Sequence, residues 1–243
     1  MTLVFASALA IQLIFWLLLG IGYRRVQSSQ PESASFEANE LPVSVIVAAR
    51  NEEANLPTLL DALAHQSYSS FEVIVADDAS VDSTPDILEE RKANWPSQKL
   101  TSIRIQDGGA ESSGLPRKKY ALTRAINAAT YDRLLFTDAD CVPGRDWVGT
   151  VIAHLQRDSG HSKDILVGYG PYLRERNALN AFVRYETLLT AVQTIAAIAW
   201  KKPFMAVGRN LSYTKDLFEK IGGFAHSASS LSGDDDLFIQ EAS

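Results

Sequence analysis

Residues 43–49 read VSVIVAA, and this short run decides the fold. An unbroken series of β-branched and small apolar residues is typical of a strand that is buried on both faces, as in a parallel sheet. Two later runs share the pattern, FEVIVA at Phe71–Ala76 and RLLF at Arg133–Phe136, and TSIRI at Thr101–Ile105 is a weaker example. The sequence therefore predicts a sheet made mainly of parallel strands.

Helical patterns separate these strands. Asn55 can cap a first helix that has Pro57 in its first turn. Thr84-Pro85 opens a second helix, from Asp86 to about Lys92, and Lys119–Ala129 has the pattern of a third. Strands and helices that alternate at this spacing predict an α/β sheet with right-handed crossovers.

The composition limits the class of protein. The 243 residues are 46% apolar and 21% charged, with 23 Lys and Arg against 29 Asp and Glu, so the net charge is −6. These values fit one globular domain and argue against disorder. A net negative chain is poorly suited to nucleic acid, because Lys and Arg supply the affinity for phosphates. The single cysteine, Cys141, excludes an internal disulfide and favours a reducing compartment.

The N-terminal segment does not belong to that domain. Leu3–Tyr23 is almost entirely apolar. This segment is long enough to span a bilayer and too long for a signal peptide. We expect a transmembrane anchor at residues 1–25 rather than a buried core helix. Arg24 and Arg25 follow the apolar run, so the positive-inside rule places the rest of the chain in the cytoplasm. Residues 26–40 have the composition of a linker, and residues 41–243 form the globular domain.

Polar residues stand where three of the predicted strands end. These groups are Arg50-Asn51-Glu52, Asp77-Asp78, and the pair Asp138 and Asp140. Ligands of open parallel sheets bind at the carboxyl ends of the strands, so we expect these groups to converge on one edge. Two carboxylates in an Asp-x-Asp pattern can bind Mg²⁺ or Mn²⁺, which prefer oxygen ligands.

The adjacent charges of Asp77 and Asp78 require a compensating donor or cation. A carboxylate there could accept hydrogen bonds from a base N–H or a ribose hydroxyl. Part of this acidic cluster has a simpler explanation, because Asp82 or Thr84 can cap the next helix.

Two further charged segments allow a functional and a structural interpretation. Pro116–Lys119 is either a solvated face or a cationic patch that neutralises a diphosphate, and the chain has no P-loop motif. Ser232–Asp236 precedes a helical start and carries three consecutive carboxylates, which is more than helix capping requires. One of these carboxylates could act as a general base toward an acceptor hydroxyl.

An apolar segment at Leu188–Trp200 is followed by Lys201-Lys202. We favour a buried helix that supports the acceptor side of the site. The alternative is an interfacial helix that rests on the membrane and admits a lipid-linked acceptor. Gly168–Tyr172 and Val207–Asn210 lie between the metal and base motifs, and we expect them to line the donor-sugar or acceptor pocket.

Six motifs together give a specific resemblance. The stretches VSVIVAARNEEANL, FEVIVADDASVDST, KKYALTRAI, LLFTDADCVP, VGRNLSYTKDLFEKIGGF and SGDDDLF stand in the order seen in family 2 glycosyltransferases and extend across residues 43–238. The resemblance implies a GT-A, Rossmann-like fold. It also implies inverting transfer from a nucleotide-sugar, commonly a UDP-sugar, to an acceptor hydroxyl, with Mg²⁺ or Mn²⁺ as the cofactor.

The resemblance assigns roles to individual residues. Asp138 and Asp140 resemble the metal-binding Asp-x-Asp of the family. Asp235 stands where the family has its catalytic base, with Asp234 and Asp236 as less suitable candidates. The positions that resemble the nucleotide-sugar-binding residues are Ala49, Arg50, Glu52, Asp77, Asp78, Lys118 and Asp138.

The chain departs from the family pattern after Asp235, because it stops at Ser243 without the Gln-x-x-Arg-Trp motif of processive members. We expect either a fragment or a form that lacks that acceptor-side segment. The expected partners are a nucleotide-sugar, a lipid-linked or cell-envelope glycan acceptor, and the cell membrane. One alternative is a catalytically silent, membrane-tethered module that binds nucleotide-sugars. A sugar nucleotidyltransferase is disfavoured, because Ala49–Glu52 is not a glycine-rich loop.

Overall fold

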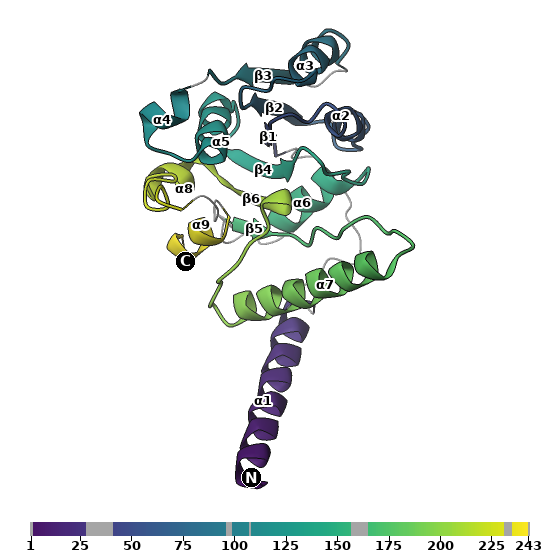
Figure 1. Ribbon diagram of the computed structural model, residues 1–243, viewed down its shortest axis with the longest axis vertical. Helices are drawn as coiled ribbons and strands as arrows, with labels where there is room; N and C mark the ends of the chain where they lie inside the picture. Colours follow the sequence, from purple (N-terminus) through teal and green to yellow (C-terminus); the bar gives the residue numbers. More distant parts are fainter. Residues whose placement is uncertain are drawn as a thin grey trace.

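The computed structural model describes residues 2–27, 41–95, 99–106, 108–156, 165–230 and 235–242. Within these ranges a six-stranded sheet runs in the order β3-β2-β1-β4-β6-β5 (Figure 1). The strands are β1 (Val43–Ala49), β2 (Phe71–Asp77), β3 (Lys99–Arg104), β4 (Arg133–Asp138), β5 (Ile165–Val167) and β6 (Leu211–Thr214). The first four are parallel to one another, whereas β6 is antiparallel to both β4 and β5. The predicted α/β sheet of mainly parallel strands is confirmed.

The register of the parallel strands aligns the ends that carry the polar residues. Ala49 of β1 pairs with Asp77 of β2, and Ala48 pairs with Asp138 of β4. The chain builds outward from β1 to β3 and then returns to β4 on the other side of β1. The strand order therefore reverses between β1 and β4, which is where open α/β sheets form a ligand-binding crevice.

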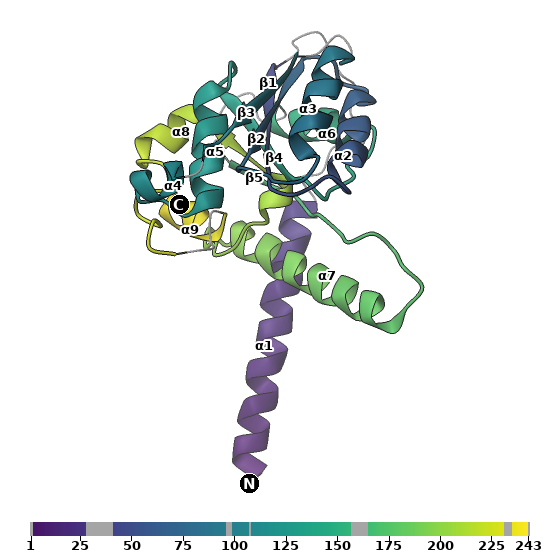
Figure 2. The same cartoon turned by 45° about the horizontal axis from the view of Figure 1, so that its top comes forward.

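Two layers of helices cover the sheet (Figures 1 and 2). One face carries α2 (Leu56–Ala64), α3 (Thr84–Ala93) and α6 (Trp147–Gln156), and the other carries α5 (Arg117–Ala128), α8 (Lys215–Lys220) and α9 (Asp236–Glu241), with α4 (Gly109–Ser113) beside α5. Successive residues of β1 contribute to different layers, because Val45 and Val47 pack on the first face and Ile46 on the second. Burial on both faces explains why β1 is apolar almost throughout.

Several local features differ from the sequence-based prediction. The strand β3 begins at Lys99 rather than Thr101 and ends at Arg104, and α3 begins at Thr84 rather than Asp86. Asn55 does not cap α2 through its side chain, because its Nδ2 donates instead to Glu52 at 2.9 Å. The elements α6, β5 and β6 were not predicted.

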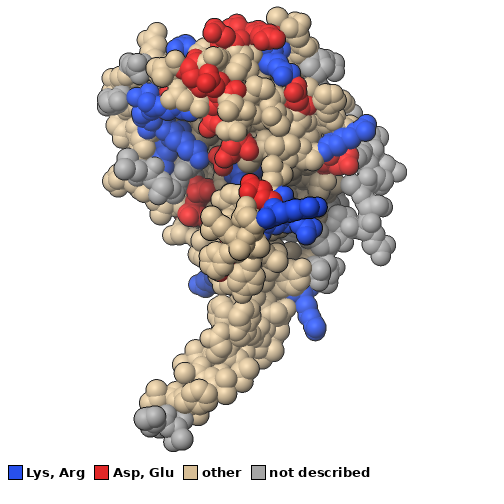
Figure 3. All heavy atoms as spheres, turned by 45° about the vertical axis from the view of Figure 1, so that its right-hand side comes forward, with Lys and Arg blue, Asp and Glu red and all other residues tan. Residues whose placement is uncertain are grey.

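The N-terminal helix α1 (Thr2–Gln27) extends away from these layers (Figure 1). Residues Val4–Val26 are long and apolar enough to cross a membrane, and only 6% of their most apolar window is buried. The helix is therefore not a core helix of the domain. Figure 3 shows the charged side chains gathered over the globular part, with very few along α1. Of the predicted linker, residues 28–40 lie outside the described ranges.

The helix α7 (Ala178–Ala199) crosses the end of α1 (Figure 2). The apolar segment Leu188–Trp200 largely belongs to this helix, but only Thr194 and Ala196 of α7 are buried. Leu188 is 50% exposed, so our preference for a buried helix was wrong. The error arose because an apolar run alone does not show whether a domain or a membrane covers it.

Candidate active site

The loops after β1 and β2 are hydrogen-bonded to each other at the carboxyl edge of the sheet. Asp78 N donates to Ala49 O at 2.8 Å, and Asn51 N donates to Ser80 Oγ at 2.9 Å. Asn51 and Ala79 adopt left-handed backbone conformations with φ of 55° and 51°. Such conformations are uncommon for non-glycine residues and persist where the surroundings enforce them. The two loops therefore form one rigid rim.

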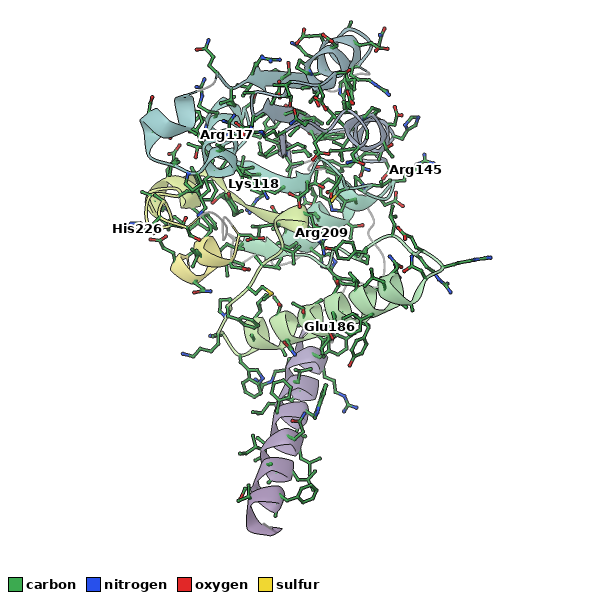
Figure 4. The ribbon with its side chains drawn as sticks, in the orientation of Figure 1. Arg117, Lys118, Arg145, Glu186, Arg209 and His226 are labelled. Atoms are coloured by element: carbon green, nitrogen blue, oxygen red, sulfur yellow. The ribbon has the colours of Figure 1, made fainter. Side chains whose placement is uncertain are left out.

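The Asp78 carboxylate is held by two arginines. Arg117 Nε, from the first turn of α5, lies 3.1 and 3.2 Å from the two carboxylate oxygens, and Arg50 Nη1 lies 3.5 Å from Oδ2 (Figure 4). The side chain of Asp78 is only 8% exposed. These cations supply the compensation that the sequence predicted for the acidic pair. The sequence placed Arg117 in the basic patch but did not single it out as a site residue.

Asp77 lies in a different environment from its neighbour. Its Oδ1 accepts from Ser80 N at 3.0 Å, and its Oδ2 accepts from Arg104 Nη1 at 3.4 Å. The residue is buried and does not line a described cavity. Asp77 therefore supports the loop that carries Asp78, and the structure does not bring it to the predicted nucleotide site.

Asp138, Asp140 and Cys141 form a cluster after β4. One ligand atom from each lies within 4.8 Å of the other two, and Lys118 Nζ lies 3.3 Å from Asp138 Oδ1. Burial raises the pKa of the Cys141 thiol. The two carboxylates are the suitable donors for a hard divalent cation, because such cations prefer oxygen to sulfur ligands.

A cavity of about 450 Å³ joins these groups at the ends of β1, β2 and β4. It contains every predicted nucleotide-sugar or metal residue except Asp77. Its lining residues are Ala48, Ala49, Arg50, Glu52, Asp78, Arg117, Lys118, Ala121, Asp138, Ala139 and Asp140. The predicted convergence of the strand ends is therefore a feature of the structure.

Asp235 is the N-cap residue of α9 and lies next to the same edge. Its Oδ2 accepts from Gly208 N at 2.7 Å, and its Oδ1 accepts from Asp236 N at 2.9 Å. A narrow recess of about 20 Å³ is lined by Asp235, Gly208, Lys118 and Asp138, among others. Asp138 thus borders both the larger cavity and the recess that contains Asp235.

The two other acidic candidates for the base are placed differently. Asp236 is turned to the backbone, where its Oδ1 accepts from Ala206 N at 2.9 Å. Asp234 lies outside the described residues.

Aromatic packing fixes the start of α9. Phe238 is 2% exposed, and its ring centroid lies 4.2 Å from that of Tyr213 on β6. Tyr213 in turn stacks on Phe136 of β4 at 4.5 Å. This stack joins the helix that begins with Asp235 to the strand that ends with Asp138.

Lys119 is a structural residue that the sequence analysis missed. It is 1% exposed, and its Nζ donates to Ser227 O at 2.7 Å and to Ser230 O at 3.0 Å. Lys119 therefore ties α5 to the loop that leads toward Asp235. Its helical spacing could have revealed this, because Lys119 falls three residues before Leu122 and seven before Ile126, on the apolar stripe.

The segments Gly168–Tyr172 and Val207–Asn210 lie side by side. Gly168 N donates to Asn210 O at 2.7 Å, and Arg209 Nε donates to Gly170 O at 2.8 Å. Both segments line a second cavity, of about 640 Å³, that also includes Asp138 and Asp140. A Cβ added at Gly208 would lie 3.4 Å from Asp235 Oδ2, an ordinary contact, so Gly208 acts through its N–H.

Known proteins resemble the chain in both sequence and fold. The family model described as glycosyl transferase family 2 matches residues 44–222. Glycosyltransferase AglE of Haloferax volcanii is 28% identical over 186 residues, which cover 75% of this chain and 55% of that protein. Beta-monoglucosyldiacylglycerol synthase of Nostoc sp. is 29% identical over 171 residues, which cover 65% of this chain and 35% of that protein. The chain thus spans between about a third and about half of these relatives.

A solved structure has the same fold. The mannosyltransferase PcManGT from Pyrobaculum calidifontis, in complex with GDP-Man and Mn²⁺, superimposes with a TM-score of 0.60 at 24% identity, over 95% of this chain and 61% of that one. This likeness supports the GT-A fold implied by the sequence. Because the family model covers most of the globular part, the chain belongs to glycosyl transferase family 2.

Proposed function

We propose that the protein transfers a sugar from a nucleotide-sugar, preferably a UDP-sugar, to a hydroxyl of a lipid-linked or cell-envelope glycan acceptor with inversion of configuration. The observation that carries this proposal is the position of Asp138. It borders a cavity rich in cationic side chains on one side and the recess of Asp235 on the other. A donor and a general base would meet at this residue.

The larger cavity offers complementary groups for a nucleoside diphosphate. Arg50, Arg117 and Lys118 provide positive charge for the phosphates. Asp78 can accept hydrogen bonds from the base or ribose, and Ala49 and Glu52 lie on the same wall. Asp77 contributes by fixing the Asp78 loop through Ser80.

The Asp138 and Asp140 carboxylates would hold Mg²⁺ or Mn²⁺, consistent with the Mn²⁺ in the PcManGT complex. When bound, the cation supplies positive charge that stabilises the leaving diphosphate. Lys118, at 3.3 Å from Asp138, adds positive charge at the same place.

Asp235 is the proposed general base. Its two hydrogen bonds to backbone N–H groups orient the carboxylate and use two of its roughly four lone-pair sites. A remaining lone pair would take the acceptor hydroxyl proton as that oxygen attacks the anomeric carbon. The acceptor oxygen attacks on the side opposite the leaving nucleoside diphosphate, so this single displacement inverts the anomeric configuration.

A donor panel tests the proposal. The full chain in detergent is incubated with UDP- and GDP-sugars, Mn²⁺ or Mg²⁺, and lipid or glycan acceptors, and free nucleotide is measured. We expect release that requires the cation, and a product whose anomeric configuration, read by NMR, is opposite to that of the donor. A donor that raises the unfolding temperature but is never cleaved would favour the silent binding module instead. A parallel incubation with nucleoside triphosphates and sugar 1-phosphates that yields a nucleotide-sugar and pyrophosphate would favour the nucleotidyltransferase.

We also propose that residues 1–25 anchor the protein in the cell membrane, with residues 26–40 as a linker and residues 41–243 as the catalytic domain. The support comes from the apolar length of α1 and its low burial. Arg24 and Arg25 favour a cytoplasmic location of the domain. Protease protection in sealed inverted vesicles would leave the domain accessible if this orientation is right.

A further inference from the structure

A third cavity, of about 390 Å³, lies between α7 and the segments that carry Val167 and Val207. Its walls are mainly apolar, with Val167 and Val207 on the sheet side and Phe182, Val183, Ala191 and Ile195 on the helix side. The proposed donor site does not use this space. Glu186, Arg209 and three threonines also line it, so the cavity suits an amphipathic occupant that joins a hydrocarbon chain to a polar group.

One end of this cavity adjoins the proposed active site. Arg209, Gly170 and Tyr172 line both this cavity and the larger one that contains Asp138 and Asp140. The Arg209 guanidinium carbon lies 4.7 Å from the Tyr172 ring centroid. Figure 4 shows Arg209 on the sheet side and Glu186 on α7. Arg209 therefore makes the cavity polar at the end that it shares with the larger one.

The other end of the cavity adjoins the proposed membrane anchor. Thr194 and Ile195 line it, and the next residue, Ala196, packs on Gly22 of α1 so closely that a Cβ at Gly22 would lie 2.8 Å from Ala196 Cα. Trp200 Nε1 donates to Leu18 O at 3.2 Å across the same junction. The cavity lining and the contact with α1 therefore share the C-terminal half of α7.

The outer surface of α7 has the same apolar character. Leu179, Tyr185 and Leu188 are between 50% and 73% exposed. A contiguous set of large apolar side chains on one helix marks an interaction surface rather than a water-facing one. The same helix packs on α1 farther along, at Ala196 and Trp200, which points to lipid as the covering partner.

We infer that this cavity binds the hydrocarbon chain of a hydroxyl-bearing membrane lipid, and that the lipid is the acceptor. The chain lies between α7 and Val207, and the hydroxyl passes Arg209 toward Asp235. The inference rests on the proposed function for the role of the lipid as acceptor, but binding of the chain is independent of sugar transfer. Each methylene buried in the cavity strengthens binding by about fourfold until the space is filled.

The test uses the full chain in phosphatidylcholine nanodiscs. The probe is a diacylglycerol with a photoactivatable diazirine on a 16-carbon acyl chain, added without any nucleotide-sugar. We expect crosslinks to peptides that contain Val167, Val207 or Ala191. Ala191→Trp fills the cavity and should reduce these crosslinks at least tenfold. Ala181→Trp makes the same change at an exposed position of α7 outside the lining and should leave them unchanged.

A second variant guards against a folding defect in Ala191→Trp. Thr190→Leu adds less bulk and should give an intermediate loss, with an unchanged unfolding temperature for the variant. Equal labelling of the wild type and both cavity variants would overturn the inference. Labelling confined to Tyr185 and Leu188 would also overturn it, because the lipid would then lie only on the outer surface.

Failure of the proposed function gives a different result. Crosslinks that Ala191→Trp removes, together with no nucleotide release from any donor, would keep the lipid site and reject glycosyl transfer. Sugar transfer to soluble glycans, with release of free nucleotide but without cavity labelling, would keep the transfer and reject the lipid site.

Discussion

The carboxyl edge of the sheet and the α7 side of the molecule are built on opposite principles. At the edge, Asp78 has arginine partners, Asp138 has Lys118, and backbone N–H groups hold Asp235. Along α7, large apolar side chains are exposed and a mainly apolar cavity lies behind them. At the edge, charged side chains are held in place by their partners, which suits the proposed ionic donor. The exposed apolar surface of α7 suits a partner without charge.

The strongest test of the edge is Asp235→Asn. The amide keeps the shape of the side chain but cannot take a proton, so we expect turnover to fall by about 10²–10⁴-fold. Donor affinity, measured by calorimetry with Mn²⁺, should stay within a factor of about three, since Asp235 lies in the recess rather than the larger cavity. An equal loss of turnover and donor affinity would remove Asp235 from the role of base.

The second test removes one proposed metal ligand. Loss of a residue that only supports a metal ligand lowers metal affinity by roughly 10–100-fold. Asp140→Ala removes a proposed ligand itself, so donor binding in Mn²⁺ should weaken by at least that factor. Cys141→Ser alters the same cluster but leaves both carboxylates in place, and should have little effect. Unchanged donor affinity in Asp140→Ala would contradict the metal role.

Substitutions of the adjacent residues Lys118 and Lys119 should have different effects, one on donor binding and the other on the stability of the fold. Lys119→Met leaves the carbonyls of Ser227 and Ser230 without a buried donor, and should lower the free energy of unfolding by about 1–3 kcal/mol. Lys118→Met, at a half-exposed position beside Asp138, should change stability by less than about 0.5 kcal/mol but weaken donor binding. Urea unfolding and calorimetry measure the two effects. Equal stability losses would show that both lysines are structural.

The smallest expected effect concerns the junction of α1 and α7. Gly22→Leu places a side chain against Ala196 and should speed amide hydrogen exchange in residues 194–199, with little change in the sheet. Gly20→Leu is the matched control, because a Cβ there meets nothing within 4 Å. Identical exchange in the two variants would mean that the packing of α1 on α7 does not stabilise α7.

The parts of the fold that follow from local pattern could be predicted from the sequence. The buried strands β1, β2 and β4 were found to within two residues at either end, because apolar runs between turn residues identify them. The antiparallel pair β5 and β6 was missed, since β5 has three residues, β6 has four, and both are defined by long-range pairing. The length and exposure of α7 were also missed. They depend on long-range packing as well, because α7 packs against α1.

Site residues could be predicted from the sequence where they stand at the end of a predicted strand. The register that aligns Ala48 with Asp138 brought the acidic groups together as expected. The roles of Arg117 and Arg104 could not be found this way, because each depends on a side-chain contact between residues far apart in the sequence. The different environments of Asp77 and Asp78 also follow from such contacts, and adjacent positions in the sequence do not distinguish them.

The crosswise packing of α7 on α1 has a kinetic consequence. At 1.5 Å per residue, the 22 residues of α7 extend about 33 Å, so the helix covers a broad area next to the end of α1. If α1 anchors the domain in a bilayer as proposed, the domain would meet lipids by diffusion in a plane rather than through a volume. Its rate would then follow the mole fraction of acceptor in the bilayer, and diluting a vesicle suspension with buffer would leave that rate per enzyme unchanged.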